Sequence, residues 1–434
     1  MTLVEFFDKD AAENICSSLT KVPERVILIG DKKIAAKHAK RYEAVLRARG
    51  FAVEFLFRPV NKNHLPTIVD ALLEIISTYD DCVFDLTGGE DLYLVAMGVV
   101  FEKQRTQEKQ EKQKKQNIQM HRFNISNNTI TDVDQDGQTI LTEEAPNLTV
   151  EEIIRIYGGK IVCEGEARNA TKHWDMNEDF KQDIQDMWDV CKYDPGLWNA
   201  QISFLAAVVR LAGETDDLKI TVPMSCLKDM VCSKDGVFMP NSRVMKELSL
   251  YGLLESYACN DEVFSVTFKN LQVKRCLTVE GQALEMIVFL TALEAAEEDG
   301  TKIYNDVMNG VCIDWDGELG TEQNSVDTEN EIDVIMMHGM VPVFVSCKNG
   351  AVDKNELYKL NAVATRFGGK YVKKVLIATS LDNSESADYF RQRAIDMNIH
   401  LVEGEKKNNV FTPFAELNKD AIDRVIRSLW STSN

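Results

Sequence analysis

The first hundred residues alternate between short apolar runs and amphipathic segments, and this alternation restricts the folds open to the chain. Continuous apolar runs that predict buried strands stand at 25–30 (RVILIG), 52–59 (AVEFLFRP) and 81–90 (DCVFDLTGGE). Helical segments follow them at 32–50, 64–78 and 91–103. Strands that alternate with helices form a parallel sheet through right-handed crossovers. The sequence therefore predicts a doubly wound, Rossmann-like α/β unit.

The polar segments after residue 101 predict an appendage to this sheet. Residues 102–118 are a low-complexity run of Lys, Gln and Glu, which either extends the preceding helix or forms a surface excursion. The short runs MHRFNIS and NTITDV flank an Asn-Asn turn and are followed by DQDGQTIL, a pattern typical of an antiparallel hairpin. We therefore assign residues 1–150 to a first domain.

A different pattern occupies the middle of the chain, 151–275. Residues 150–190 are helical and polar and predict a connector, whereas 197–213 and 241–258 predict amphipathic helices that precede the strand-like VFSVTFKN. Helices followed by a small β-ribbon resemble a winged helix-turn-helix. Such a unit either reads a DNA groove or spaces two domains or subunits. The second helix has only Arg243 and Lys246 as basic residues, which favours spacing.

The last part of the chain, 276–434, again combines helices with buried strands. The expected order is a helix at 277–297, a strand–turn–strand unit at 331–350 with its turn at His338-Gly339, then helix 355–369, strand 373–380, helix 386–399 and strand 400–404. This order predicts a second α/β domain with an opening helix and a β-hairpin.

Charge and cysteine usage limit the classes of function. The formal net charge of −20 argues against non-specific nucleic-acid binding by bulk charge, although it leaves room for a local basic site or an acidic metal site. The ten cysteines show no CxxC spacing, which favours reduced thiols in the core. The sequence has neither a signal-peptide pattern at its start nor an apolar run of membrane-spanning length, so we expect a cytoplasmic protein.

Acidic and basic side chains meet in the predicted hairpin. Alternation places Glu331 and Asp333 on one face of the first strand, and the turn returns the end of the second strand, with Lys348, close to Asp333. Buried carboxylates are costly unless something pairs them, and a divalent cation would do so, with the lysine orienting or polarising an attacking water beside a phosphate. The alternative is a surface salt bridge at the end of a strand.

This arrangement resembles the core of the PD-(D/E)XK nucleases. The resemblance matches Asp333 to the first acid, Lys348 to the lysine and Glu285, in GQALEMIV, to the acid of the preceding helix. Ser346 stands where the family has its second acid. Three explanations are open: Glu331 takes over as the second carboxylate, Ser346 binds the metal through water, or the site is weakened. We favour Glu331 because it shares a face with Asp333.

A longer stretch of the chain is similar to the C-terminal domain of a family of proteins that join this nuclease fold to a CARF (CRISPR-associated Rossmann fold) domain. The stretch consists of NEIDVIMMHGMVPVFVSCKNG and, after it, ELYKLNAVATRFGGKYVKKVLIAT. The resemblance extends over 281–380, whereas in the first domain it is limited to a short motif. It implies an N-terminal Rossmann-like CARF domain, a central winged-helix-like region and a C-terminal restriction-endonuclease-like α/β domain.

The candidate ligand site of the first domain lies at the predicted carboxyl ends of its strands, where open parallel sheets bind ligands. The residues there are Gly30, Asp31, Lys32, Lys33, Arg58, Thr87, Gly88 and Gly89. Neither GxGxxG nor a P-loop is present, so a dinucleotide site is not supported. The turn DLTGGE offers glycines and a helix N-terminus to a ribose-phosphate, or it is a plain strand–helix turn.

The LTGG sequence also resembles the nucleotide-binding turn of CARF domains. That turn usually continues with Thr-Lys, whereas this chain has Glu90-Asp91, so Lys32, Lys33 and Arg58 are the candidates for the positive charge. The resemblance implies a cyclic oligoadenylate as ligand, with cyclic tetra-adenylate as the expected ring. A symmetric ring fits a homodimer in which each subunit gives one set of loops.

Together these expectations describe a homodimeric endonuclease of type III CRISPR defence, activated by cyclic tetra-adenylate, dependent on Mn²⁺ or Mg²⁺, and acting on DNA or RNA. Glu285, Glu331 and Asp333 would hold the metal, while Lys348 and Ser346 would complete the catalytic group. The alternative is a non-catalytic, nucleotide-sensing DNA-binding regulator with a degenerate nuclease domain, which Ser346 supports. A third hypothesis is that the first domain itself degrades the cyclic ligand.

Overall fold

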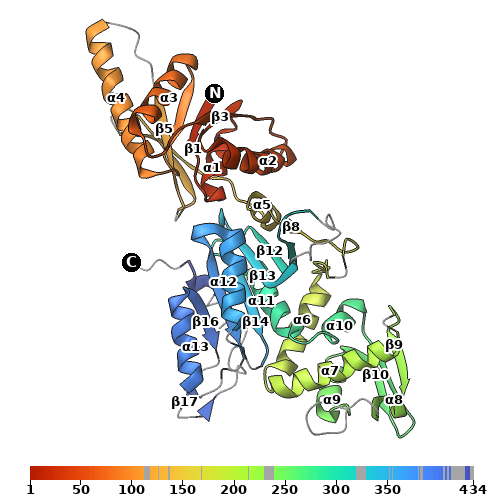
Figure 1. Ribbon diagram of the computed structural model, residues 1–434. Helices are drawn as coiled ribbons and strands as arrows, with labels where there is room; N and C mark the ends of the chain where they lie inside the picture. The colour runs from red at the N-terminus through yellow and green to blue at the C-terminus, as the bar shows by residue number, and fades with distance from the viewer. Residues whose placement is uncertain are drawn as a thin grey trace.

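The computed structural model describes residues 1–111, 118–125, 127–134, 137–167, 169–213, 215–228, 239–318, 329–350, 352–353, 355–379, 381, 385–403, 406–407, 410–411 and 426–430. These residues form a mixed α/β structure whose sheets have seven, three, six and two strands. The seven-stranded sheet lies at one end of the molecule, the three-stranded sheet lies toward the other end, and the six-stranded sheet lies in the middle (Figure 1). No helix of the described part is long and apolar enough to cross a membrane.

The N-terminal sheet has the strand order β3-β2-β1-β4-β5-β6-β7. Its parallel strands are β1 (Thr2–Phe6), β2 (Arg25–Gly30), β3 (Glu54–Pro59), β4 (Cys82–Asp85) and β5 (Gln119–Asn124). The parallel sheet was predicted, but β1, an inner strand between β2 and β4, was missed. The reason is that Glu5 interrupts the apolar run TLVEF, yet it is only 2 % exposed and bonded to Ser18.

Helices cover both faces of this sheet, so its doubly wound character is as predicted. They are α1 (Ala11–Lys21), α2 (Lys32–Ala48), α3 (Leu65–Thr78) and α4 (Asp91–Glu111). α3 and α4 pack together on one face, while α1 and α2 lie on the other. The low-complexity run extends α4 as far as Glu111, and residues 112–117 lie outside the described part.

The expected hairpin is present and has one strand more. β6 (Thr129–Val133) pairs antiparallel with β5, and β7 (Thr139–Glu144) pairs antiparallel with β6. Asn128, in the Asn-Asn turn, has a left-handed backbone with φ of 47°, a conformation that asparagine tolerates better than most residues.

The middle of the chain contains helices and a small antiparallel sheet, and the helical prediction for 150–190 was correct only in part, because 157–167 and 169–177 are not helical. The helices are α6 (Glu178–Cys191), α7 (Pro195–Leu211), α8 (Met224–Lys228), α9 (Ser242–Leu250) and α10 (Leu271–Cys276). β9 (Lys219–Pro223), β10 (Leu254–Cys259) and β11 (Val263–Phe268) pair in the order β10-β11-β9. The prediction of one helix over 241–258 was wrong, because α9 ends at Leu250 and Gly252, with φ of 72°, turns the chain into β10.

The C-terminal sheet has the order β16-β15-β14-β13-β12-β8. Its strands are β8 (Lys160–Ile161), β12 (Asp306–Asp314), β13 (Glu329–His338), β14 (Val341–Lys348), β15 (Lys373–Ala378) and β16 (Ile399–Glu403). The predicted hairpin turns at Gly339, whose φ is 62°. β12 and β8 were not predicted; Asn309 and Gly310 break the apolar pattern of β12, and β8 is too short to show one.

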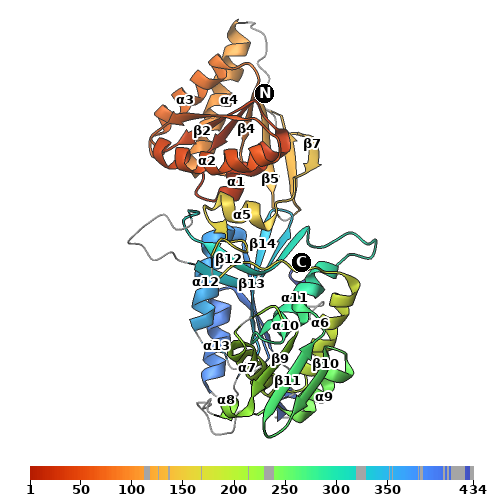
Figure 2. The same cartoon turned by 90° about the vertical axis from the view of Figure 1, so that its right-hand side faces the viewer.

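Helices pack on both faces of this sheet. α11 (Gln282–Glu294) lies with α6 on one face, and α12 (Asn355–Gly368) and α13 (Glu385–Asp396) lie on the other. The helix expected over 277–297 is shorter in the structure: α11 begins at Gln282, after Gly281 with φ of 84°, and ends at Glu294, while α10 lies before the expected range. α5 (Val150–Ile156) lies between the two large sheets in both views (Figures 1 and 2).

Candidate functional site

The two strands of the central hairpin separate at Asp333. The β13–β14 ladder runs from His338 and Val341 to the pair Val334–Val345 and ends there. Beyond this point the Asp333 carboxylate accepts a hydrogen bond from the Cys347 N–H, at 2.5 Å, and another from the Ser346 hydroxyl, at 3.3 Å. The fork between β13 and β14 therefore holds one carboxylate in a fixed orientation at the end of a buried ladder.

Lys348, the last residue of β14, approaches the same carboxylate. Its Nζ lies 3.7 Å from an Asp333 oxygen and 3.3 Å from a Glu356 oxygen. Partial burial opposes the charge of Lys348, but Asp333 and Glu356 outweigh this effect and raise the pKa of the lysine above its ordinary value. The structure thus brings Lys348 and Asp333 together, as the hairpin prediction required.

Glu356 was missed by the sequence analysis. It stands in the first turn of α12, where a negative charge is favoured by the helix dipole, and it also binds Lys359 at 2.8 Å. Burial acts against its charge, and the two lysines lower the pKa of Glu356 below the ordinary value. The sequence signal that could have identified Glu356 is an acidic residue at the start of the helix that follows a strand ending in a lysine, Lys348.

Glu285 and Glu331 approach the fork from α11 and from β13. Burial, with the charges of Asp333 and Glu331 in addition, raises the pKa of Glu285 well above its usual range. Burial and the charge of Asp333 also raise the pKa of Glu331. The pKa of Asp333 is raised mainly by burial. These carboxylates therefore repel one another and lack sufficient positive charge around them.

The donor set suits a hard divalent cation in its chemistry. Within the described residues, no three His, Cys, Asp or Glu side chains lie close enough together to form a complete protein cage for a metal ion. Mg²⁺ is commonly held by one or two carboxylates with water and substrate phosphates instead. Asp333, with Glu285 and Glu331 as neighbours, fits such an incomplete site. Ser346, 8 % exposed, turns its hydroxyl to Asp333 and supplies no carboxylate.

A recess of about 420 Å³ adjoins Glu331, and we call it the connector recess. Its other lining residues come from the segment after β8, from α10 and from β12: Glu164, Gly165, Ala167, Asn169, Ala170, Lys172, Arg275 and Cys312. None of these residues was predicted as functional, since 150–190 resembles a plain polar connector and Arg275 and Cys312 stand in no recognisable motif.

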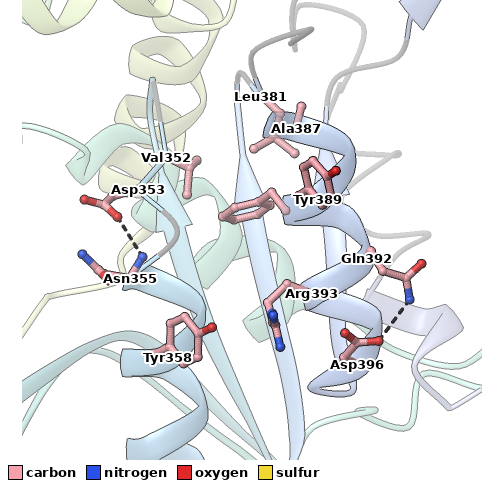
Figure 3. A pocket seen from close by; sticks show the side chains of 11 residues that line it. Val352, Asp353, Asn355, Tyr358, Leu381, Ala387, Tyr389, Gln392, Arg393 and Asp396 are labelled. Carbon is pink, nitrogen blue, oxygen red and sulfur yellow. Dashed lines mark hydrogen bonds between the residues drawn. The ribbon is translucent and has the colours of Figure 1, made fainter. Parts of the chain in front are cut away.

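A larger groove, of about 690 Å³, lies between α12 and α13. Figure 3 shows Tyr358 on one wall and Tyr389 and Arg393 on the other, with Asp353 and Asn355 at the end nearest β14. The dashed contacts join Asp353 to Asn355 and Gln392 to Asp396 along each wall (Figure 3). No residue that the sequence analysis predicted as functional lines this groove.

In the N-terminal sheet, the predicted ligand residues lie on one edge, at the carboxyl ends of β2, β3 and β4. Lys32 and Lys33 are exposed in the first turn of α2. Asp31 is the N-cap of that helix and accepts hydrogen bonds from the Lys33 and Ile34 N–H groups, at 2.9 and 3.1 Å, so its role is structural. Arg58 forms an ion pair with Glu74, and this pair partly neutralises the positive charge that Arg58 could offer to a ligand.

The turn after β4 is anchored from several sides. The Thr87 hydroxyl accepts the Phe123 N–H at 2.8 Å, and the Gly89 N–H donates to an Asp8 oxygen at 3.1 Å. Gly89 has φ of 97°, and a Cβ there would lie 2.5 Å from that of Phe6. Gly89 thus permits close packing on β1. Asp8 follows β1, and it was missed because β1 itself was missed.

The same segment connects the ligand edge to the C-terminal sheet. Asp8 accepts the Asp10 N–H at 2.8 Å, and the Asp10 carboxylate accepts the Tyr157 hydroxyl at 2.7 Å and the Lys370 N–H at 2.9 Å. Glu13, in the first turn of α1, binds the Lys370 ammonium. Lys370 belongs to the 3₁₀ turn Gly369–Tyr371 directly after α12.

No protein-family model and no curated protein matches this sequence. Its structure is similar to protein VC1899 from Vibrio cholerae, with a TM-score of 0.69 and 17% identity over 99% of this chain and 97% of that one. It is also similar to Can2 from Sulfobacillus thermosulfidooxidans, solved in complex with cyclic tetra-adenylate, with a TM-score of 0.58 and 15% identity over 92% and 94% of the two chains. At these identities the likeness concerns the fold, and it extends over nearly the whole of each chain.

Proposed function

We propose that this protein is a nucleic-acid endonuclease that depends on a divalent metal and is activated by a cyclic oligoadenylate, as an ancillary protein of type III CRISPR defence. The observation that carries the nuclease part is the fork between β13 and β14. There Lys348 contacts Asp333, Glu285 and Glu331 lie near enough to feel the charge of Asp333, and the three acids have raised pKa values. Perturbed carboxylates around one lysine are typical of sites that perform chemistry.

Asp333, together with Glu285 or Glu331, would hold the metal, in a site that leaves room for water and a substrate phosphate. Mg²⁺ or Mn²⁺, when bound there, would supply Lewis-acid stabilisation of charge on the phosphate and a more acidic water. Lys348 stays protonated because of Asp333 and Glu356, so it acts as a fixed positive charge beside the reacting phosphate. Ser346 positions Asp333 through its hydroxyl.

The sensing part rests on the ligand edge of the N-terminal sheet. Lys32 and Lys33 are exposed after β2, on the same edge as the Thr87-Gly88-Gly89 turn after β4, with β1 between the two strands, and this edge suits an anionic nucleotide ring. The fold is shared with Can2, which has been solved with cyclic tetra-adenylate, and this supports the same ligand class. A homodimer would present two such edges to the symmetric ring.

The test is a cleavage assay with supercoiled plasmid, single-stranded DNA and single-stranded RNA. Each substrate is incubated with Mn²⁺, with Mg²⁺ or with EDTA, and each with and without cyclic tetra-adenylate. The expected result is cleavage that needs both metal and ring. If the ring binds, as measured by calorimetry, and no substrate is cut under any condition, the nuclease proposal is wrong, and the non-catalytic regulator that Ser346 suggests takes its place.

A further inference from the structure

The connector recess contains a lysine that has no partner among the described residues. Lys172 is exposed and forms no hydrogen bond or ion pair within the described part of the chain. Its charge nevertheless reaches the candidate site, because it lowers the pKa values of Glu285 and Glu331 against the effect of burial. Within the part of the chain that the structure describes, Lys172 is thus an unpaired cation near carboxylates that would hold the metal.

The second cation of the recess is weakly held. Arg275, at the end of α10, pairs only with Glu164 among the described residues, at 3.4 Å, and both side chains are nearly half exposed. Exposed pairs of this kind contribute little and exchange readily for a better anion. Asn169 adds an amide to the same wall. The recess therefore offers two cations and one polar group from two separate segments.

On the other side of the fork, the cations have partners. Lys348 is shared between Asp333 and Glu356, and Lys359 pairs with Glu356. The whole chain carries a formal charge of −20, so its average field repels nucleic acid. A polyanionic substrate that reaches Asp333 consequently needs local positive charge, and the connector recess supplies it next to Glu331.

From this juxtaposition we infer that the connector recess binds a non-scissile phosphate of the nucleic-acid strand that is cut at the fork, with Lys172 and Arg275 as its ligands. The inference rests on the proposed nuclease function and adds a phosphate subsite to it. Lys172 is then a positioning residue: it sets the register of the strand and takes no part in the chemistry. Because phosphates carry no sequence information, the subsite predicts binding without sequence preference.

The experiment uses the full-length protein in two forms. In the first, KM and kcat for cleavage are measured over a series of salt concentrations for the wild type, Lys172→Ala, Lys172→Arg and Arg275→Ala. In the second, each substitution is added to Asp333→Asn, and binding of a short fluorescein-labelled oligonucleotide is followed by anisotropy. The matched control is Lys103→Ala, which removes one exposed lysine from α4, remote from the fork.

The expected result for Lys172→Ala is a rise in KM of about tenfold with kcat nearly unchanged, since a charged phosphate contact of about 1.5 kcal/mol is lost. The slope of log affinity against log salt should become shallower by about 0.7–0.9, the value of one phosphate contact. Lys172→Arg should stay close to the wild type, and Lys103→Ala should change neither quantity.

Oligonucleotide binding with the same affinity and salt slope in wild type and Lys172→Ala would overturn the inference. So would a fall in kcat at constant KM, since Lys172 would then serve as an internal counter-ion of Glu285 and Glu331. The anisotropy arm separates the two proposals: if the protein cuts nothing but still loses salt-dependent binding on removal of Lys172, the nuclease function fails and the phosphate subsite stands.

Discussion

Glu13 and Lys370 form an ion pair, with their charged atoms 2.7 Å apart, between the first turn of α1 and the 3₁₀ turn after α12. The Glu13 side chain is 3% exposed and that of Lys370 is 51% exposed. Glu13 also accepts the Tyr371 hydroxyl at 2.5 Å, and a Cβ on Gly88 would lie 3.5 Å from its second oxygen. One buried carboxylate therefore touches both the ligand turn and the segment that ends α12.

Lys370→Ala should weaken the dependence of cleavage on the ring. Removal of the ammonium leaves Glu13 buried without its cation, which shifts the balance between arrangements of the two sheets. We expect a changed ratio of ring-stimulated to basal cleavage, with KM for nucleic acid unaltered. The measurement is initial rate against cyclic tetra-adenylate concentration. Lys359→Ala is the control, because it removes a lysine on the exposed side of α12; equal ratios in both variants would refute the coupling.

Asp333→Asn and Lys348→Ala should each lower kcat by about 10²–10³, the range seen when one electrostatic contact to a reacting group is removed. Neither should change ring binding. Asparagine retains an oxygen for the Cys347 N–H, so Asp333→Asn should keep the fold. Circular dichroism and calorimetric ring binding verify this, and wild-type cleavage rates in a folded Asp333→Asn protein would contradict the site.

Glu331→Gln and Ser346→Ala separate the candidates for the second acidic position. We expect Glu331→Gln to raise the Mn²⁺ concentration for half-maximal cleavage by about tenfold or more, since it removes a charged ligand of a hard cation. Ser346→Ala removes only a 3.3 Å hydrogen bond to Asp333 and should have a smaller effect. The reverse order would place Ser346 at the metal.

Glu285→Gln should stabilise the metal-free protein at pH 8 while it impairs metal-dependent activity. Burial raises the pKa of Glu285, so the folded state binds the proton more tightly than the unfolded state does, and ionisation costs stability as pH rises through the folded pKa. Glutamine mimics the protonated form. We expect a rise of about 2 °C in the thermal midpoint at pH 8, corresponding to about 1 kcal/mol, and a smaller rise at pH 5. An equal rise at both pH values would contradict the assignment.

Gly89→Ala should abolish ring binding and destabilise the protein, because the new Cβ would collide with Phe6 at 2.5 Å in a backbone conformation that alanine disfavours. Lys33→Ala, at an exposed position, should weaken ring binding without loss of stability. Calorimetric titration with cyclic tetra-adenylate and a thermal unfolding scan distinguish the two effects. Ring affinity unaltered in Lys33→Ala would remove this lysine from the pocket.

Local patterns in the sequence were sufficient for most elements. Apolar runs and glycine stops predicted β2, α2, α3 and β15 because these elements are regular and buried in the way their own residues indicate. The hairpin was predicted for the same reason, and with it the meeting of Asp333 and Lys348. Alternation and turn chemistry are local properties, so a single sequence contains them.

The tertiary structure decided what depends on partners distant in the sequence. β1 lies inside its sheet, between β2 and β4, although Glu5 interrupts its apolar run, and the Ser18 hydroxyl of α1 donates a hydrogen bond to one oxygen of that buried carboxylate. Glu356, Lys172 and Arg275 reach the fork or its recess from segments that read as ordinary helix or connector. Likewise Asp8, Asp10 and Glu13 join the ligand edge to Lys370 only after both sheets have formed. The residue types were determined by the sequence, but their convergence depends on long-range packing, which no local pattern specifies.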